Sequence, residues 1–172
     1  MKLLISFILV IFYANASNLK DITSYQASFT QSIVNSSNKE ILYNGTIYIK
    51  KPSDVLWKYN DPIIKNVYIL SNQVIIIEPD LEQVIISTLK EEINILDLLK
   101  NSTKISKNRY EAIIYDKKYI LTIKNNQLTQ INYSDEIENK VTIYFKDIKQ
   151  NHKISSTYFK FKIPNSYDVI RK

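Results

Sequence analysis

The sequence contains no cysteine, one glycine and one histidine among its 172 residues. Without cysteine the chain has no disulfide and no thiol nucleophile, so its core must hold the fold unaided. A single glycine excludes the Gly-rich phosphate loops and the G-x-S-x-G nucleophile motif. The one histidine, His152, lies between Asn151 and Lys153 without metal-ligand spacing, so we expect it at the surface. We therefore expect no catalytic residue, no metal and no cofactor, and the chain is not predicted to be an enzyme.

Acidic residues are outnumbered in this chain: 17 Asp and Glu stand against 23 Lys and Arg, which gives a net charge of +6. A nucleic-acid-binding protein gathers such charge in a stripe or patch. Here the lysines are scattered over strand positions that we expect to face solvent. Charge of this kind bears on solubility and association rather than on fold. Nucleic acid is therefore not an expected partner.

The N-terminus has the three parts of a secretory signal peptide: Lys2, an apolar run over 3–12, and Ala14-Asn15-Ala16 as the cleavage site. A membrane anchor is the less favoured alternative, because a bilayer span needs about 20 apolar residues. Cleavage after Ala16 leaves 17–172 as a single domain. No cysteine follows the apolar run to accept a lipid. We therefore expect a soluble, monomeric protein of the periplasm of a Gram-negative bacterium.

Alternation of apolar and polar residues dominates the rest of the sequence, as in half-buried strands. The expected strands are 25–33, 41–51, 54–59, 64–70, 73–78, 82–88, 109–115, 118–124, 127–134 and 140–149, with a final edge strand over 158–163. We place tight turns at Ser71-Asn72, around Pro79, at Asp116-Lys117 and at Asn125-Asn126. Short helices are expected over 17–24 and 91–100.

So few helical residues cannot cover a sheet of this width. We therefore predict a mainly β (α+β) fold, in which an incomplete antiparallel β-barrel of about ten to eleven strands is lidded by short helices. A sandwich of two flat sheets is the alternative.

A cation stands where the alternation calls for an apolar residue. Ile47, Ile49 and Lys51 share one face of the strand over 41–51, and beyond the Lys51-Pro52 corner Trp57 and its neighbours two residues away form another apolar face. The chain also has 13 tyrosines, six phenylalanines and one tryptophan. Most of these pack the core, but we expect some to line a cavity for an apolar ligand.

Five segments together resemble one known family. In chain order they are YQASFTQ (25–31), GTIYIKKP (45–52), VLWKY followed by Asp61-Pro62 (55–62), EPDLEQV (78–84), and FKFKIP followed by Asp168-Val169-Ile170 (159–170). Their order and spacing resemble the periplasmic outer-membrane lipoprotein carriers of the LolA family over the whole mature length. The sequence departs from the family pattern at Lys51, where arginine is usual, and at Val55, where a larger apolar residue is common. The turn at Ser71-Asn72-Gln73 replaces the usual Asp-Gly.

The resemblance implies a chaperone that takes lipoproteins from an inner-membrane ABC-type release complex and carries them to the outer membrane, where a lipoprotein acceptor is a further possible partner. It implies an acyl-chain cavity lined by Tyr25, Phe29, Ile47, Ile49, Trp57, Tyr59, Ile93, Leu96 and Leu99. It also implies a lid latch at Lys51 and Pro52, and docking of a partner at Val55.

Two points stay open at this level. Lys51 either latches the lid by binding carbonyls at the end of the helix over 91–100, or extends its ammonium into water at the rim. The alternative function is a periplasmic sensor of the same fold that detects mislocalised lipoproteins. An outer-membrane acceptor is less favoured, because the chain has no cysteine to carry a lipid.

Overall fold

The computed structural model describes residues 21–88 and 95–172, so the predicted signal peptide, most of the helix expected over 17–24, and Ile93 lie outside the described residues. The strands are β1 (Ser24–Val34), β2 (Glu40–Lys50), β3 (Asp54–Asp61), β4 (Lys65–Leu70), β5 (Gln73–Glu78), β6 (Gln83–Thr88), β7 (Thr103–Lys104), β8 (Arg109–Ile114), β9 (Lys117–Lys124), β10 (Gln127–Ser134), β11 (Lys140–Gln150) and β12 (Asp168–Arg171). The helical elements are α1 (Ile95–Asn101) and the short 3-10 turns η2 (Pro79–Leu81) and η3 (Ser156–Phe159). Within these ranges no helix has the length and apolarity needed to cross a membrane.

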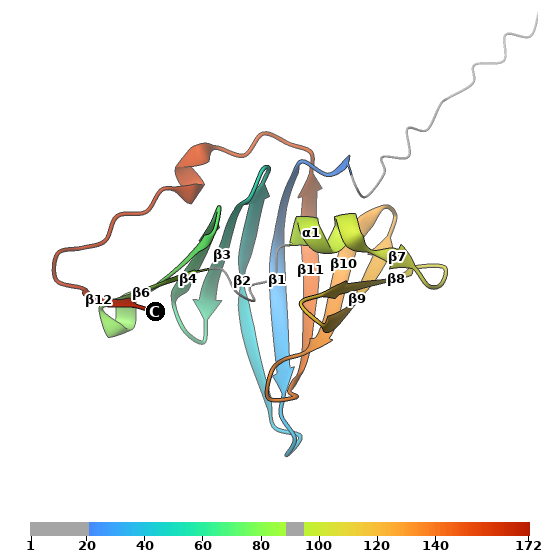
Figure 1. Ribbon diagram of the computed structural model, residues 1–172, viewed down its shortest axis with the longest axis horizontal. Coiled ribbons are helices and arrows are strands. Elements are labelled where there is room, and N and C mark those ends of the chain that lie inside the picture. Colours follow the sequence, from blue (N-terminus) through green and yellow to red (C-terminus); the bar gives the residue numbers. More distant parts are fainter. Residues whose placement is uncertain (1–20, 89–94) are drawn as a thin grey trace, which may run out of the picture.

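In the described ranges, all twelve strands belong to one sheet, in the order β12-β6-β5-β4-β3-β2-β1-β11-β10-β9-β8-β7. Neighbouring strands in this sheet run antiparallel, except β12 and β6, which run parallel. Two meanders, β1 to β6 and β8 to β11, meet where β1 pairs with β11, an alignment that sets Tyr25 opposite Gln150. The sheet curls around α1, which crosses one of its faces (Figure 1). The mainly β, open-barrel prediction is confirmed and the two-sheet alternative is wrong, although the strands exceed the expected ten or eleven.

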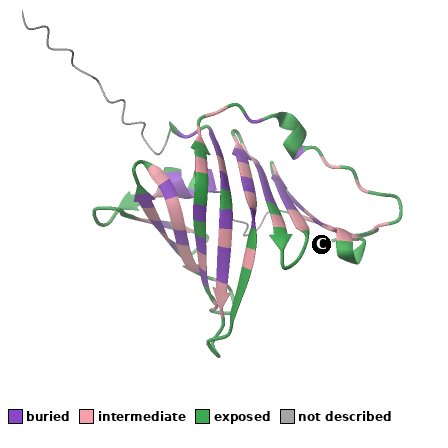
Figure 2. Ribbon diagram, turned by 180° about the vertical axis from the view of Figure 1, so that it is seen from behind, coloured by how far each residue is buried: buried purple, intermediate pink, exposed green. Residues whose placement is uncertain are grey.

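Alternation along the strands gives the sheet two apolar faces, visible as bands of burial in Figure 2. The concave face holds the larger core, to which β1, β2, β3, β4, β5, β8, β9, β10, β11 and α1 contribute. The convex face holds a second core that includes Leu56, Tyr68 and Ile75, the sequence neighbours of concave residues on β3, β4 and β5. Neighbouring residues therefore support opposite cores, as period-two strands require.

The C-terminal arm over 151–167 covers the convex core. Ile154 and Phe159 are buried in it, and Phe161 lies 5.2 Å, centroid to centroid, from the ring of Tyr68. The edge strand expected over 158–163 is thus wrong, because these residues are fixed by side-chain packing on the convex face and not by a β ladder. The actual edge strand is β12, whose Asp168 N–H donates to Glu82 O at 2.9 Å.

The two hairpin turns on either side of β9 are made by residues with a left-handed backbone. Asn125 and Asn126 have φ of 50° and 60°, as expected for a two-residue hairpin. The preceding hairpin turns at Tyr115-Asp116, with φ of 50° and 60°, one residue earlier than predicted. The helix expected over 17–24 is also wrong at its end, because Ser24 already begins β1.

Candidate functional site: a cavity on the concave face

A cavity of about 480 Å³ opens on the concave face, between the two arms of the curled sheet. One wall comes from β3, β4 and β5, the other from β9, β10 and β11 with the turn after β10, and Gln31 of β1 lies between them. The lining residues are Gln31, Trp57, Tyr59, Lys65, Val67, Ile76, Lys117, Tyr119, Tyr133, Asp135, Glu136, Ile137 and Ile143. Its volume lies within the roughly 300–1,000 Å³ of ordinary ligand sites.

Edge-to-face aromatic contacts build the first wall. The ring of Phe29 lies 5.1 Å from Trp57 and 5.1 Å from Tyr59, centroid to centroid, at angles near perpendicular. Phe29 itself sits directly opposite Gly45 in the β1–β2 pairing. A β-carbon on Gly45 would lie 2.7 Å from two ring atoms of Phe29 and closer still to the carbonyl oxygen of Lys58. The only glycine of the chain is therefore what allows Phe29 to support this wall.

Polar groups gather where strands begin and end, at one end of the cavity. The Lys65 ammonium lies 4.7 Å from the centroid of the Tyr59 ring, within the range of a cation–π contact. The Tyr59 hydroxyl donates to Gln31 Oε1 at 3.0 Å. Lys117 Nζ lies 3.3 Å from Glu136 Oε1. The cavity thus has apolar walls and one charged end, an arrangement that suits a ligand with an apolar tail and a polar head.

Three of the predicted cavity residues, Tyr25, Ile47 and Ile49, are fully buried in the concave core and do not line the open cavity. The Tyr25 hydroxyl donates to Leu128 O at 2.8 Å, which links β1 to β10. Burial raises the pKa of Tyr25 well above the ordinary value for tyrosine. This phenol therefore remains neutral and serves as a buried donor, while Trp57 and Tyr59 do line the cavity.

The described part of the predicted lid is α1, which presents Ile95, Leu96, Leu98 and Leu99 to the concave core. Its backbone lies against β8. The prediction placed it against Trp57, Ile47 and Ile49, which belong to the same core but lie on β3 and β2. Leu96 and Leu99 therefore share a core with the cavity wall without lining the cavity itself.

Lys51 and Pro52 are exposed at the turn between β2 and β3. The Lys51 backbone N–H donates to Thr23 O at 2.9 Å, and across the described ranges its ammonium makes no hydrogen bond or ion pair. The burial of Val55 contradicts its predicted role in docking a partner. Its side chain is fully buried, so a partner could reach it only if the core opened.

The second wall was missed by sequence reasoning. Tyr119, Tyr133 and Ile143 sit on strands that the alternation predicts, but no local pattern shows that these strands face β3 and β4. His152 also differs from expectation: it is half-buried, and its Nε2 lies 3.1 Å from Gln26 Oε1.

Comparison with known proteins relates the chain to one family. The sequence model of the family described as outer membrane lipoprotein carrier protein LolA matches residues 20–162. An outer-membrane lipoprotein carrier protein of Campylobacter jejuni is 38% identical over 148 residues, which cover 86% of each chain. One of Wolinella succinogenes is 35% identical over 154 residues, covering 89% of this chain and 90% of the relative.

The fold is shared with a protein whose structure has been solved. The crystal structure of an uncharacterized conserved protein from Thermus thermophilus superposes with a TM-score of 0.53 at 10% identity, covering 92% of this chain and 96% of the other. At this level of identity the likeness concerns the fold alone.

Proposed function

The chain belongs to the LolA family of outer-membrane lipoprotein carrier proteins, and from this membership we propose that it carries lipoproteins by enclosing their acyl chains in the concave cavity. The observation that supports this most directly is the cavity between the two arms of the sheet, with aromatic and aliphatic walls and a charged end. Carriage of this kind involves binding and release, without a chemical step.

The physical need for such a cavity follows from the strength of acyl anchoring. Each buried CH₂ contributes about 0.8 kcal/mol, so a protein with two or more acyl chains leaves a membrane only if the chains enter another apolar environment. A polar surface could not supply that environment. A cavity with apolar walls supplies it, while the charged end around Lys65, Lys117 and Glu136 lies where the polar part of the cargo would emerge.

We further propose that the lid competes with cargo. Closure of the lid helix over the concave core lowers the apparent affinity for acyl chains by the fraction of carriers that are open. Lys51 as a latch would bind carbonyls at the end of α1, where Asp97 O and Leu99 O already accept hydrogen bonds from Asn101 Nδ2 and Ser102 Oγ. A carbonyl oxygen has two lone pairs, so the latch would form as a second contact on an oxygen that is already bonded.

The periplasm is the compartment that fits this function, reached through the proposed signal peptide over 1–16. There the carrier would receive lipoproteins from an inner-membrane ABC-type release complex and deliver them to the outer membrane or to an acceptor in it. Folding in that compartment does not depend on disulfide formation, since the chain has no cysteine.

Trp57 provides the test, because it is the only tryptophan of the chain and lines the cavity. Adding a diacylated lipopeptide to the protein that begins at Ser17 should change Trp57 fluorescence saturably. The same peptide without acyl chains is the control and should leave the spectrum unchanged. Val67→Lys places a charge in the cavity and should abolish the response, whereas Val169→Lys on the exposed β12 should not. Equal responses to the acylated and deacylated peptides would refute acyl binding in this cavity.

A further inference from the structure

We propose that a second, basic pocket on this protein binds a phosphate group. The pocket has a volume of about 650 Å³ and lies where the C-terminal arm leaves β11 and passes the ends of β1 and β2. Its lining residues are Thr23, Ser24, Lys50, Lys51, His152, Lys153, Ile154, Ser155, Ser156, Thr157 and Lys160.

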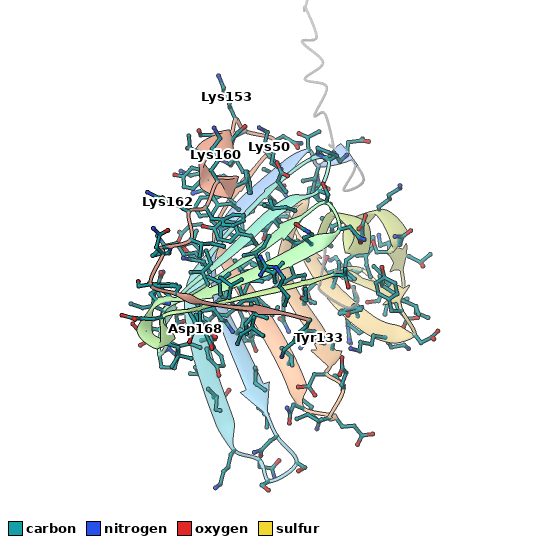
Figure 3. All side chains as sticks on the ribbon, turned by 60° about the vertical axis from the view of Figure 1, so that its left-hand side comes forward. Lys50, Tyr133, Lys153, Lys160, Lys162 and Asp168 are labelled. Carbon is teal, nitrogen blue, oxygen red and sulfur yellow. The ribbon has the colours of Figure 1, made fainter. Side chains whose placement is uncertain are left out.

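The lining has charge of one sign. Four lysines, Lys50, Lys51, Lys153 and Lys160, are among the lining residues, and no aspartate or glutamate is among the described residues that line the pocket. Figure 3 shows Lys50, Lys153 and Lys160 together at one end of the molecule, around the turn at η3. Like charges around one pocket repel one another, and an anion bound among them is attracted to each. The sequence gives no hint of this cluster, because residues about a hundred positions apart compose it.

The donors suit phosphate better than carboxylate. A planar carboxylate is matched by the fork of arginine, and no arginine lines the pocket, whereas lysine acts as a point charge for phosphate. Hydroxyl groups complete the set: Lys50 Nζ donates to Ser156 Oγ at 2.8 Å, and Ser155 Oγ lies 2.8 Å from Thr157 Oγ1. These contacts bring the Lys50 ammonium together with hydroxyl groups of a segment about a hundred residues further along the chain.

The walls of the pocket are fixed to each other before any ligand binds. Ser24 Oγ donates to His152 O at 2.6 Å, and Thr23 N–H donates to Asn151 Oδ1 at 2.8 Å. His152 lies in this wall with its Nδ1 buried and without a hydrogen-bond partner among the described residues. A pocket whose walls are already joined binds without the cost of ordering them.

The basic pocket is separate from the acyl cavity. It adjoins Ser24 at the start of β1, whereas the cavity adjoins Gln31. Seven residues of strand at about 3.3 Å each place these points roughly 23 Å apart. Its volume exceeds what inorganic phosphate alone would fill, so a phosphate esterified to a small polyol fits, either in a lipid headgroup or as a soluble ester. The proposal does not rest on the carrier function and could hold if that function failed.

His152 allows a direct experiment, because its ring gives the only histidine signals in an NMR spectrum. Glycerol 3-phosphate and inorganic phosphate are titrated separately into the protein that begins at Ser17. We expect saturable shifts of the His152 ring and of the backbone amides over 155–157. The variant Lys50→Gln/Lys160→Gln should bind at least roughly tenfold more weakly, since each lost contact is a charge-assisted hydrogen bond. Lys162→Gln is a control on the same arm, because Lys162 is exposed but outside the lining, and each single variant, Lys50→Gln and Lys160→Gln, is compared with it at equal loss of charge.

A vesicle arm distinguishes the two sources of phosphate. Co-sedimentation uses vesicles of phosphatidylcholine alone and vesicles of equal parts phosphatidylcholine and phosphatidylglycerol. Binding to the anionic vesicles that glycerol 3-phosphate displaces, and that the double variant loses, identifies the headgroup as the source. Saturable shifts with soluble phosphates but no vesicle binding identify a free ester.

Three outcomes would overturn the proposal. They are the absence of a saturable shift with either phosphate, an equal loss in Lys162→Gln, which would indicate diffuse charge, and a response only to an acidic peptide such as poly-glutamate. Circular dichroism of each variant establishes that it is folded before its binding is compared.

Discussion

Replacing Gly45 by alanine tests whether the only glycine of the chain holds the cavity wall in place. The added β-carbon would lie 2.7 Å from two atoms of the Phe29 ring and would overlap the carbonyl oxygen of Lys58. On the side of Trp57 and Tyr59 the ring has no room to move, because it already contacts both at 5.1 Å between centroids. The carbonyl can move only if β2 and β3 separate, because these strands pair at this point. Neither neighbour gives way at low cost.

Overpacking a core costs about 1–3 kcal/mol, and the rigid backbone neighbour places Gly45→Ala at the upper end of that range. In a protein of this size each kcal/mol lowers Tm by roughly 2–4 °C, so we expect Tm to fall by roughly 6–12 °C. Thermal and urea unfolding followed by circular dichroism measure this change. Thr46→Ala, at the next position of β2, is the control and should cost less than about 1 kcal/mol.

A double variant shows which contact dominates. If the Phe29 ring is the obstacle, Gly45→Ala combined with Phe29→Leu should be less destabilised than the sum of the two single variants, with a coupling energy of about 0.5–3 kcal/mol. Gly45→Ala within 0.5 kcal/mol of the wild type, roughly the level of an ordinary surface substitution, would refute the argument that this close approach is rigid.

Three further predictions concern the latch, the buried phenol and the C-terminal arm. Lys51→Leu should slow the release of acyl cargo by roughly tenfold or more, because a charge-assisted hydrogen bond of ~1.5–3 kcal/mol would no longer close the lid. Lys51→Arg should speed the release. Equal off-rates for wild type and Lys51→Leu would mean that no latch exists. Tyr25→Phe should cost about 1–2 kcal/mol at neutral pH, since Leu128 O loses a buried donor. Above pH 10.0, the ordinary pKa of tyrosine, Tyr25 loses its proton in the unfolded chain and keeps it in the folded one, so the stability of the wild type falls as the pH rises. Tyr25→Phe lacks this contribution. Its free energy of unfolding, measured with urea, should therefore fall less steeply than that of the wild type, by about 1.4 kcal/mol per pH unit. Phe159→Ala should cost roughly 3 kcal/mol, because it removes a buried ring from the convex core. Tyr158→Ala is the control and should cost measurably less, because Tyr158 is 44% exposed. Equal melting temperatures for the two variants would contradict the packing of the arm.

Sequence periodicity predicted the central strands because their pattern is local. The boundaries of β5 and β10 agree with the expected ranges, since alternation and the flanking turns define both ends. β12 was missed because its four residues are all exposed and show no alternation. It is a strand only because its backbone pairs with β6, and that information is not in its own residues. The opposite error over 158–163 has the same origin, since alternation marks one-sided burial and does not require a partner strand.

The candidate site likewise contains residues that a local pattern predicts and residues whose place depends on strand pairing. Trp57 and Tyr59 were found because they follow one another on a predicted strand face and belong to a recognisable motif. Tyr119 and Tyr133 were not, although their rings lie 5.2 Å apart on the opposite wall. Their place depends on the pairing of β1 with β11, which joins segments separated by more than a hundred residues. A prediction of this cavity therefore needs the order of strands in the sheet, and single-strand patterns do not contain it.

The two apolar faces of the sheet are covered in different ways, and this difference bears on function. Both faces are apolar and both must be kept from water. The convex face is covered by the chain's own arm, whose Phe159 and Ile154 fill it. The concave face is covered by α1 near β8, while the region between Trp57 and Tyr133 remains a cavity. Among the described residues, the chain's own arm covers one face and a cavity opens on the other, which is the arrangement that a carrier with an exchangeable apolar cargo requires.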